Sequence, residues 1–413
     1  MHILFVSTLD FKPKSIQVIR KTPEAYAKAG HKVSYLTFRD ADEFSDHFYE
    51  PVINPEGIEV VRMRLPGVFL RRHLPGRSKD VFQKIRIPLF FLPWALYQCL
   101  RVHKKNPVDV LYGYESWGVI ATHLVNLLLR KPIVSRFQGS KLYPYLEKRR
   151  YFALLFKAEY ILALCLPGDL TLMTDDGTKG DRVLQALRSP VKRLLFWKNG
   201  VDMDMREPNF DRRSFKKNLN IDPERVMILM VSRLVRWKRV DRAIDALFHL
   251  KQTGIEIPLL IIVGDGALKA ELIDYAKQRG VSDVVVFVGA VFHEQVKDFM
   301  NSADIFLSLY DLSNVGNPLL EALVCGMPII TIDNGDTARI IKDGVNGMLI
   351  PSGEEEQIPI LVAEAITKLT VDAEFRRHLQ RGARVYAEEN LWSWDERLAA
   401  EVKEVEALLS QKK

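Results

Sequence analysis

The sequence has 413 residues, of which 47% are hydrophobic and 27% are charged, and its formal net charge is +7. A single hydrophobic core stops growing at roughly 250–300 residues, so we expect two domains. The composition excludes a long disordered chain, and the three cysteines are too widely spaced for a disulfide framework or a zinc site. We interpret them as small core residues, which favours a reducing cytoplasm.

The chain begins with MHILFVSTLD, which fits a first buried strand better than a signal peptide. Apolar runs of this kind then alternate with amphipathic stretches along the whole chain. In the first half the predicted strands are HILFVST, KVSYLTF, VDVLYGY, KPIVSRF and YILALC, and in the second half they are VMILMVSR, LLIIVGDG, VVVFVGA, ADIFLSL and GMPIITI. This alternation predicts an α/β fold with two doubly wound, Rossmann-like domains, joined near the turn dipeptide Asn199-Gly200.

Positive charge is concentrated in residues 60–106, which contain 11 Lys and Arg against one acid, Asp80. The sequences FLRRHLPGRSK and KIRIPLFFLPWALYQCLR mix cations with large apolar residues, as surfaces in a lipid headgroup region do. The longest apolar run, residues 87–100, is shorter than the roughly 20 residues that span a bilayer. We therefore expect a cytoplasmic protein, peripheral at the inner membrane face, with an anionic membrane surface or anionic acceptor as partner. No nucleic-acid-binding module is recognised, so we expect no nucleic acid partner.

Five segments of the second half carry a specific order and spacing of motifs. They are VSRLVRWKRVDRAIDAL (231–247), VGDGALKAEL (263–272), VFVGAV (286–291), NVGNPLLEALVCGMPII (314–330) and DGVNGMLI (343–350). Together they resemble the family-4 retaining glycosyltransferases (glycosyl transferases group 1), which have the GT-B architecture. The resemblance implies a nucleotide diphosphate sugar as donor, a glycan or lipid-linked acceptor, retention of the anomeric configuration, and neither a metal nor another cofactor.

The resemblance also implies how the chain is divided. Residues 1–197 form an acceptor-binding domain, 198–205 a linker, 206–390 the nucleotide-sugar-binding domain, and 391–413 a helix that crosses back to the N-terminal domain.

Arg233 and Lys238 follow a predicted strand, where an enzyme without a metal needs fixed positive charge for two phosphates. Arginine grips phosphate through two parallel bonds, and lysine supplies a compact charge. The family places its phosphate-binding cations at these positions. The alternative interpretation is a pair of solvated loop cations, as we expect Arg236 and Arg239 to be.

A second anion site is predicted at NVGNPLLEAL, where a helix begins near Pro318. Gly316 lets the backbone approach a ligand, and the N–H groups of Asn317 to Leu320 favour an anion. Glu321 is expected in the first turn of this helix, where the helix dipole alone would favour an acid. In the family this Glu binds the ribose hydroxyls, and the backbone of Val288 to Ala290 meets the base.

Two positions depart from the family pattern. The family usually has a Glu at the position of Ser313 and a His at that of Gln138, and Gln cannot exchange a proton. Asp311 is a candidate for the missing carboxylate, and the glycine-rich loop after the first strand is replaced by LDFKPKSIQ. We assign catalysis to Arg233, Lys238 and Gln138, and donor binding to Arg233, Lys238, Val288, Gly289, Ala290, Ser313, Asn314, Val315, Gly316, Asn317, Pro318, Leu319 and Glu321.

Other functions remain open at the level of sequence. The changes at 313 and 138 allow a non-catalytic nucleotide-sugar-binding protein on the same scaffold. Asp202 and Asp204 have the spacing of a metal-binding acid pair but fall in the interdomain joint. VGDGALKAEL is similar to a dinucleotide fingerprint, yet Lys269 stands where the third glycine belongs.

Overall fold

The structure is a computed structural model that describes residues 1–11, 17–39, 53–67, 78, 82, 84–140, 142–149, 154 and 156–410. Most of the predicted basic sequence FLRRHLPGRSK and the centre of LDFKPKSIQ therefore lie outside the described residues. No helix among the described residues combines the length and the apolar character needed to cross a membrane.

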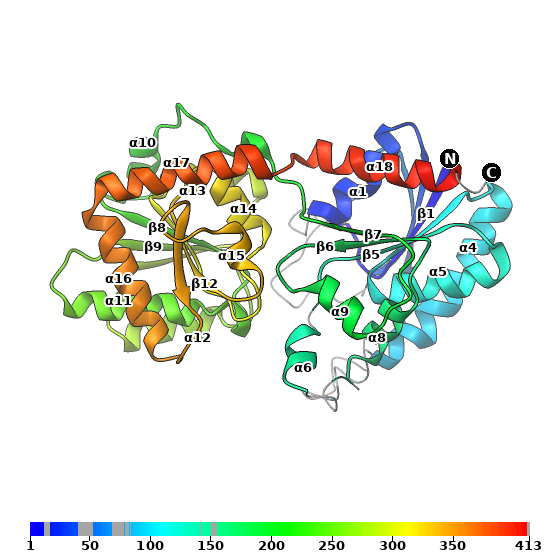
Figure 1. The fold of residues 1–413 in the computed structure, drawn as a ribbon, viewed down its shortest axis with the longest axis horizontal. Helices are drawn as coiled ribbons and strands as arrows, with labels where there is room; N and C mark the ends of the chain where they lie inside the picture. Colours follow the sequence, from blue (N-terminus) through cyan, green and yellow to red (C-terminus); the bar gives the residue numbers. More distant parts are fainter. Residues whose placement is uncertain are drawn as a thin grey trace. The chain divides into compact units, whose positions relative to one another are not determined.

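The chain folds into two compact units. The N-terminal unit comprises Met1–Asp175, Lys179–Asn199 and Trp394–Lys413, and the C-terminal unit comprises Asp176–Thr178 and Gly200–Ser393. Each unit has one parallel β-sheet with helices on both faces (Figure 1), which confirms the expected α/β architecture of two doubly wound units.

The N-terminal sheet has the strand order β3-β2-β1-β4-β5-β6-β7. Its strands are β1 (His2–Ser7), β2 (Lys32–Arg39), β3 (Ile58–Arg64), β4 (Val110–Tyr114), β5 (Ile133–Phe137), β6 (Leu170–Thr174) and β7 (Leu194–Trp197). Its helices are α1 (Gln17–Lys28), the π-helix η1 (Ile87–Phe91), α4 (Leu92–Lys105), α5 (Glu115–Leu129), α6 (Tyr143–Glu147), α8 (Ala158–Cys165), α9 (Gly180–Ala186) and α18 (Trp394–Ser410).

The C-terminal sheet has the order β10-β9-β8-β11-β12-β13. Its strands are β8 (Met227–Val231), β9 (Leu259–Val263), β10 (Val285–Gly289), β11 (Ile305–Ser308), β12 (Ile329–Asp333) and β13 (Gly347–Pro351). Its α-helices are α10 (Arg212–Asn218), α11 (Val240–Gln252), α12 (Lys269–Gln278), α13 (His293–Ser302), α14 (Asn317–Val324), α15 (Thr337–Ile340), α16 (Gln357–Val371) and α17 (Ala373–Asn390), with 3-10 turns η2 (Met203–Met205) and η3 (Arg236–Lys238).

Parallel strands covered on both faces are buried along their whole length, which explains their continuous apolar sequences. LLIIV in β9 is buried at every position. The prediction of a strand at YILALC was wrong, because these residues belong to helix α8. A short all-apolar run fits a buried helix as well as a buried strand. Strands β3, β6 and β13 were not predicted.

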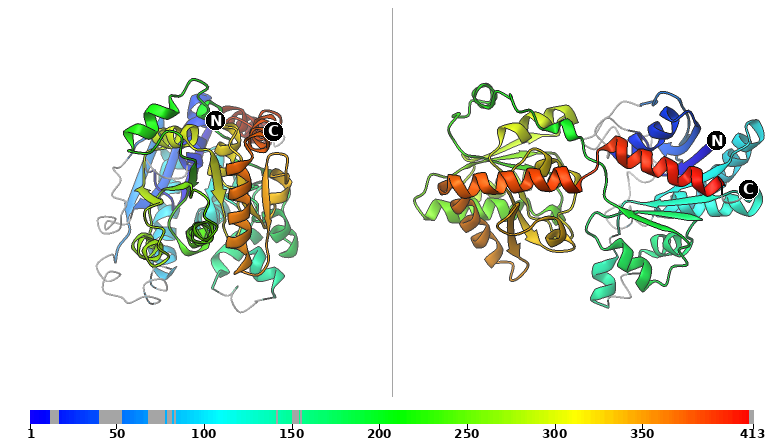
Figure 2. Two further views of the ribbon diagram at one scale, coloured as in Figure 1. Left: turned by 90° about the vertical axis from the view of Figure 1, so that its left-hand side faces the viewer. Right: turned by 45° about the horizontal axis from the view of Figure 1, so that its top comes forward.

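Helix α18 packs beside α1 on one face of the N-terminal sheet (Figures 1 and 2). Its apolar side, including Trp394, Leu398 and Val405, joins the same core as Ile3 and Phe5. Helices α4, α5 and α8 pack on the other face of this sheet, in separate clusters of core residues.

A buried ion network holds α18 in place. Glu401 is fully buried and pairs with Arg136 of β5 and, at 2.9 Å, with Arg397. The hydroxyl of Tyr112 in β4 donates to the same carboxylate at 2.6 Å. The two guanidinium groups outweigh the effect of burial, so the pKa of Glu401 lies below its usual value although burial alone would raise it.

Candidate functional site

The predicted phosphate-binding elements lie at the switch point of the C-terminal sheet. Strands β8 and β11 are neighbours, and the chain proceeds outward from β8 to β10 on one side and from β11 to β13 on the other. In such sheets ligands bind outside the carboxyl ends of the strands where the order reverses. Arg233 follows the end of β8, and residues 309–316 connect the end of β11 to α14.

Arg233 and Lys238 have different surroundings at this edge. The Arg233 side chain is exposed and makes no hydrogen bond or ion pair with the residues that the structure describes. The Lys238 ammonium lies 3.4 Å from the centre of the Tyr310 ring and 4.2 Å from that of Trp237. These two rings hold the ammonium by cation–π attraction. Both cations therefore lie at the carboxyl edge of the sheet, Arg233 exposed and Lys238 against two aromatic rings.

Tyr310 ties the two strand ends together. Its hydroxyl donates to the carbonyl oxygen of Val231, the last residue of β8, at 3.2 Å. Burial raises the pKa of Tyr310 to about 12, so the phenol remains protonated and able to donate. Sequence reasoning missed Tyr310 and Trp237. The available signal was an aromatic residue just after one strand end and another beside the predicted phosphate lysine.

Asn314 braces the loop from inside. Its side-chain oxygen accepts hydrogen bonds from the Ser308 hydroxyl and the Tyr310 N–H, both at 2.9 Å. Its amide nitrogen donates to Asn334 at 2.9 Å, and the residue is fully buried. Val315 and Leu319 are core residues of the same unit. These three predicted donor-binding side chains therefore position the loop.

The start of α14 differs from the prediction. The helix begins at Asn317, so Glu321 is its fifth residue and lies beyond the first turn, contrary to the sequence interpretation. Pro318 has no N–H, and the N–H groups of Leu319 and Leu320 already donate to the Gly316 carbonyl. The prediction that the N–H groups of Asn317 to Leu320 are all available to an anion was thus wrong for Pro318, Leu319 and Leu320.

Gly316 keeps one side of this turn open. Among the described residues, a Cβ atom there would have only the Pro318 side chain within 4 Å, at 3.8 Å. Glu321 lies one turn further along the helix and is 5% exposed. The backbone around Gly316 can therefore be approached closely, which is the property that the sequence predicted for it.

Ser313 is covered by a segment from earlier in the chain. Its hydroxyl donates to the carbonyl oxygen of Asp176 and accepts the N–H of Val315 at 3.1 Å. A Cβ atom at Gly177 would lie 2.3 Å from the Ser313 hydroxyl oxygen. Ser313 therefore fills a small space under Asp176–Thr178, within the C-terminal unit.

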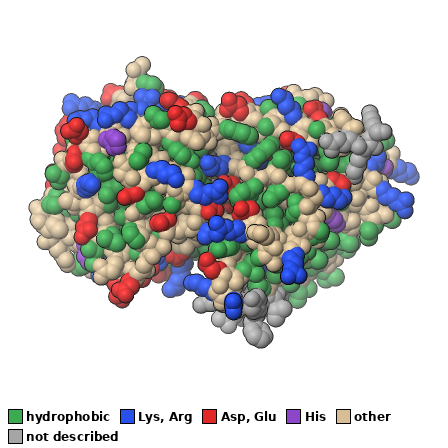
Figure 3. Space-filling model, in the orientation of Figure 1, with side chains coloured by type: hydrophobic (Ala, Val, Ile, Leu, Met, Phe, Trp, Pro, Cys, Tyr) green, Lys and Arg blue, Asp and Glu red, His purple; other side chains and the backbone are tan. Residues whose placement is uncertain are grey.

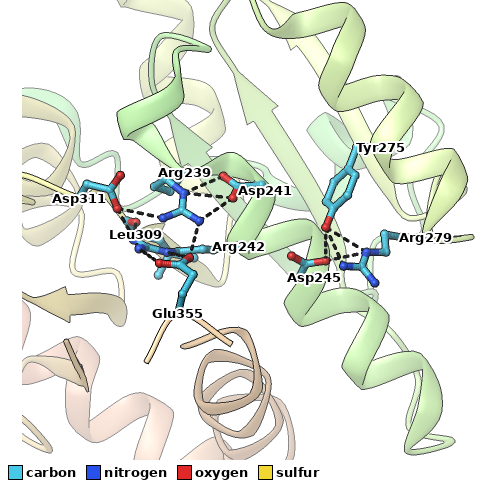
Figure 4. A network of polar contacts seen from close by, with 9 residues as sticks. All are labelled: Arg239, Asp241, Arg242, Asp245, Tyr275, Arg279, Leu309, Asp311 and Glu355. Carbon is cyan, nitrogen blue, oxygen red and sulfur yellow. Dashed lines mark hydrogen bonds and ion pairs between the residues drawn. The ribbon is translucent and has the colours of Figure 1, made fainter. Parts of the chain in front are cut away.

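Asp311 and Arg239 belong to a separate ion network (Figure 4). Asp311 pairs with Arg239 at 3.1 Å and with Arg242 at 2.8 Å. Arg239 also pairs with Asp241 at 2.8 Å and with Glu355. The interpretation of Arg239 as a solvated cation was wrong, and the Asp311 carboxylate already has two cationic partners.

This network lies beside a cavity of about 610 Å³ in the C-terminal unit. The cavity is lined by Val235, Arg236, Arg239, Val240, Asp241, Leu268, Glu271, Leu272, Tyr275, Gln278, Asp311 and Glu355. None of the predicted donor-binding residues lines it. Within η3, Arg236 therefore faces this cavity, whereas Lys238 contacts the rings of Tyr310 and Trp237.

The glycines of VGDGALKAEL serve backbone packing. A Cβ atom at Gly264, whose φ is +138°, would lie 1.9 Å from the carbonyl oxygen of Ser232. The N–H of Gly264 donates to the Gly289 carbonyl at 2.8 Å, which uses one of the backbone groups expected to meet a base. Val288 and Ala290 flank Gly289 at the end of β10 and are half-buried. The glycines thus let the loops after β8, β9 and β10 lie close together.

Gln138 follows β5 in the N-terminal unit. Its backbone N–H donates to the Glu115 carboxylate at 2.7 Å, and its side-chain amide donates to the Tyr114 hydroxyl at 2.8 Å. Its side-chain oxygen makes no hydrogen bond with the residues that the structure describes. Gln138 is therefore oriented by the end of the neighbouring strand β4, with one acceptor available.

Comparison with known proteins gives consistent results for this chain. Residues 211–386 match the family model described as glycosyl transferases group 1. An uncharacterized glycosyltransferase of Methanocaldococcus jannaschii is 24% identical over 323 residues, which cover 74% of this chain and 78% of that protein.

Solved structures with the same fold cover nearly the whole chain. Sucrose-phosphate synthase from Thermosynechococcus elongatus aligns over 100% of both chains with a TM-score of 0.77 and 18% identity. The HepE protein of Anabaena, solved in complex with UDP-glucose, aligns over 98% of this chain and 100% of its own with a TM-score of 0.70 and 16% identity.

Proposed function

We propose that this glycosyltransferase, whose residues 211–386 match the glycosyl transferases group 1 family, transfers a sugar from a nucleotide diphosphate sugar with retention of the anomeric configuration. The family match favours an enzyme over the non-catalytic binding protein that the sequence left open. The observation that carries the proposal is the pair Arg233 and Lys238 at the switch point beside the open backbone at Gly316.

In this proposal Arg233 and Lys238 hold the diphosphate. The departing nucleotide carries two phosphates, whose charge grows as the bond to the sugar breaks, so fixed cations lower the barrier. Arg233 is exposed with no protein partner in the described residues, which leaves its planar donor groups for a bidentate phosphate contact. Lys238 is held on the Tyr310 ring, which fixes its position without neutralising its charge. The reaction then needs no metal.

The remaining donor contacts follow from the same edge. The turn at Gly316 and the start of α14 approach the phosphates, Glu321 accepts hydrogen bonds from the ribose hydroxyls, and the backbone at Val288 and Ala290 meets the base. The complex of HepE with UDP-glucose supports a donor of this class.

We propose that Gln138 binds a hydroxyl of the transferred sugar. Its amide nitrogen is used by Tyr114, and its side-chain oxygen remains to accept a hydrogen bond from a sugar hydroxyl. An amide group neither gains nor loses a proton near neutral pH, so Gln138 orients the sugar and does not act as a base.

We propose a glycan or lipid-linked acceptor, such as a precursor of a cell-surface polysaccharide, bound by the N-terminal unit at the cytoplasmic membrane face. The support is the excess of cations in residues 60–106, which suits an anionic partner.

Slow hydrolysis of nucleotide sugars by the purified chain tests the proposal. A panel of UDP-, GDP- and ADP-sugars is incubated with the protein, and released nucleoside diphosphate and the anomer of the freed sugar are followed. We expect release from one donor class, with the original anomer formed first. The absence of release and of nucleotide binding across the panel would refute the proposal.

A further inference from the structure

The helical segment of residues 84–105, which contains η1 and α4, has an unusual outer side. Its inner side, with Phe91, Ala95 and Cys99, is buried in the core. A helix that covers a sheet normally turns polar residues outward. Here Ile85, Leu89 and Tyr97 are 57%, 60% and 62% exposed. The outer side of this helix is therefore apolar as well.

The π-helical turn aligns these residues. Ile85, Leu89, Pro93 and Tyr97 recur at intervals of four, which in a continuous α-helix would drift around the axis. A π-helix closes i→i+5 hydrogen bonds and has more residues per turn, so the stretch Ile87–Phe91 reduces this drift. The exposed apolar side chains thus form one stripe.

The neighbouring helices extend this stripe into a surface. Helix α5 packs against α4 and α8 packs against α5, all on one face of the sheet. Every large hydrophobic residue that is exposed in the described part of the N-terminal unit lies in η1, α4, α5 or α8 or within two residues before η1 or α8. They are Ile85, Leu89, Tyr97, Leu124, Leu127, Leu128, Phe156 and Leu162. Figure 3 shows hydrophobic side chains gathered over this part of the unit, with Lys and Arg at the right-hand edge.

The charges of the layer indicate what covers it. Residues 84–131 contain seven Lys and Arg but only two acids, Asp109 and Glu115. The outward side of α4 continues from Tyr97 into the exposed residues Arg101 and Lys104. Cations suit the C-terminal end of any helix, but this does not explain the apolar stripe before them. A second copy docked on the same surface by two-fold symmetry would bring like charges together, whereas a bilayer with anionic lipids complements both features.

We propose that the outer face of α4, α5 and α8 is the surface on which this protein rests on an anionic lipid bilayer. The inference rests on the membrane-associated acceptor proposed above and adds the place of contact. The apolar stripe enters the boundary between headgroups and acyl chains, and the cations contact lipid phosphates. The contact is reversible and weakens with salt, because exposed charges are screened.

Sedimentation of the full chain with vesicles tests this surface. The vesicles are phosphatidylcholine with and without phosphatidylglycerol, and the variant is the double replacement Leu89→Glu and Leu127→Glu. Val371→Glu is the matched control, because Val371 is 72% exposed on α16 of the C-terminal unit. We expect the double variant to lose at least about tenfold in partition to acidic vesicles, and the control to bind like the wild type.

A charge variant tests the second feature. Arg101→Gln with Lys104→Gln should weaken binding to acidic vesicles and flatten its dependence on salt. Three results would overturn the proposal: unchanged binding of the Leu89/Leu127 variant, no binding of the wild type to acidic vesicles, or a wild-type dimer in ultracentrifugation that the same variant dissociates. Titration of each variant with UDP and GDP separates the surface from the donor site. Normal nucleotide binding without vesicle binding would reject the surface and leave the donor assignment intact.

Discussion

The ammonium of Lys238 lies 3.4 Å from the centre of the Tyr310 ring, and the hydroxyl of that ring donates to the end of β8. The Tyr310 side chain thus links β11 to β8 at the switch point. Its ring also contacts Lys238, the cation that we assign to the diphosphate.

Replacing Arg233 or Lys238 by Ala should weaken nucleoside diphosphate binding. Each change removes charge-assisted hydrogen bonds of about 1.5–3 kcal/mol, so affinity should fall roughly tenfold or more. Calorimetric titration measures this directly. Arg236→Ala is the control. Arg236 lies in the same 3-10 turn as Lys238, but it lines the cavity that none of the predicted donor-binding residues lines. Unchanged affinity in both Ala variants would reject the assignment.

Glu321→Gln should weaken nucleotide binding by a similar roughly tenfold factor while the fold is retained, because a neutral amide is a poorer acceptor for ribose hydroxyls. A deoxyribose analogue provides the second half of a double-mutant cycle. The wild type should bind the analogue more weakly than the ribonucleotide, and the variant should show a smaller difference between the two. Equal penalties for the analogue in both proteins would place the ribose elsewhere.

Ser313→Glu should lower both stability and turnover. The larger side chain has to displace the segment at Gly177, and overpacking of this kind costs about 1–3 kcal/mol. Ser313→Ala removes only the hydrogen bonds of the hydroxyl and should cost about 1 kcal/mol. Urea unfolding and the donor panel compare the two variants. A Ser313→Glu protein as stable as the wild type and faster in transfer would show that the position is open to the donor.

Glu401→Gln should destabilise the protein strongly. The change leaves Arg136 and Arg397 buried without their counter-charge, which typically costs about 3–5 kcal/mol. Glu406→Gln on the same helix removes a half-exposed pair with His31 and should cost less than about 1 kcal/mol. Denaturant unfolding measures the loss of unfolding free energy in both variants. Equal losses for Glu401→Gln and Glu406→Gln would contradict the role of the buried network.

The ion pairs of Glu355 should make a pH-dependent contribution to the free energy of unfolding. Hydrogen bonds from Arg242 lower the pKa of Glu355 from 4.5 to about 2. A carboxyl group with a depressed folded-state pKa stabilises the fold above the unfolded value and loses this effect as the pH falls from 4.5 towards 2. Its side chain is 53% exposed, so solvent screening limits the effect to about 1 kcal/mol or less.

The difference in unfolding free energy between wild type and Glu355→Gln should therefore be largest at neutral pH and shrink on acidification. Glu354→Gln, a change at the preceding exposed glutamate, serves as the control. A difference that stays constant from neutral pH down to the folded-state pKa would contradict the pairing.

The sequence predicted the alternating α/β architecture because each buried parallel strand leaves a continuous apolar run. The same signal failed at residues 160–165, where helix α8 is as apolar as a buried strand although its Leu162 is 50% exposed. The positions of Arg233 and Glu321 followed from motif spacing, but the start of α14 decided whether Glu321 lies in the first turn. An error of one residue in a helix boundary changes that conclusion.

The internal support of the site was beyond sequence reasoning. Asn314 contacts Ser308, Tyr310 and Asn334, and Ser313 contacts Asp176, which is 137 positions away. Such contacts depend on which loops the sheet order brings together. From the sequence, Asp311 is likewise a candidate for binding the donor. The structure shows that its carboxylate is paired with Arg239 and Arg242.

The place of α18 has a consequence for how the chain folds during synthesis. The ribosome makes β1 before the C-terminal unit and α18 after it, yet Trp394, Leu398 and Val405 complete the core around Ile3 and Phe5. All residues of the C-terminal unit have been made once Ser393 is added, whereas the part of the N-terminal sheet beside α1 stays uncovered until α18 follows. The N-terminal unit, most of which is made first, thus finishes folding last. Until α18 packs on it, its exposed core residues are a surface to which a chaperone would bind.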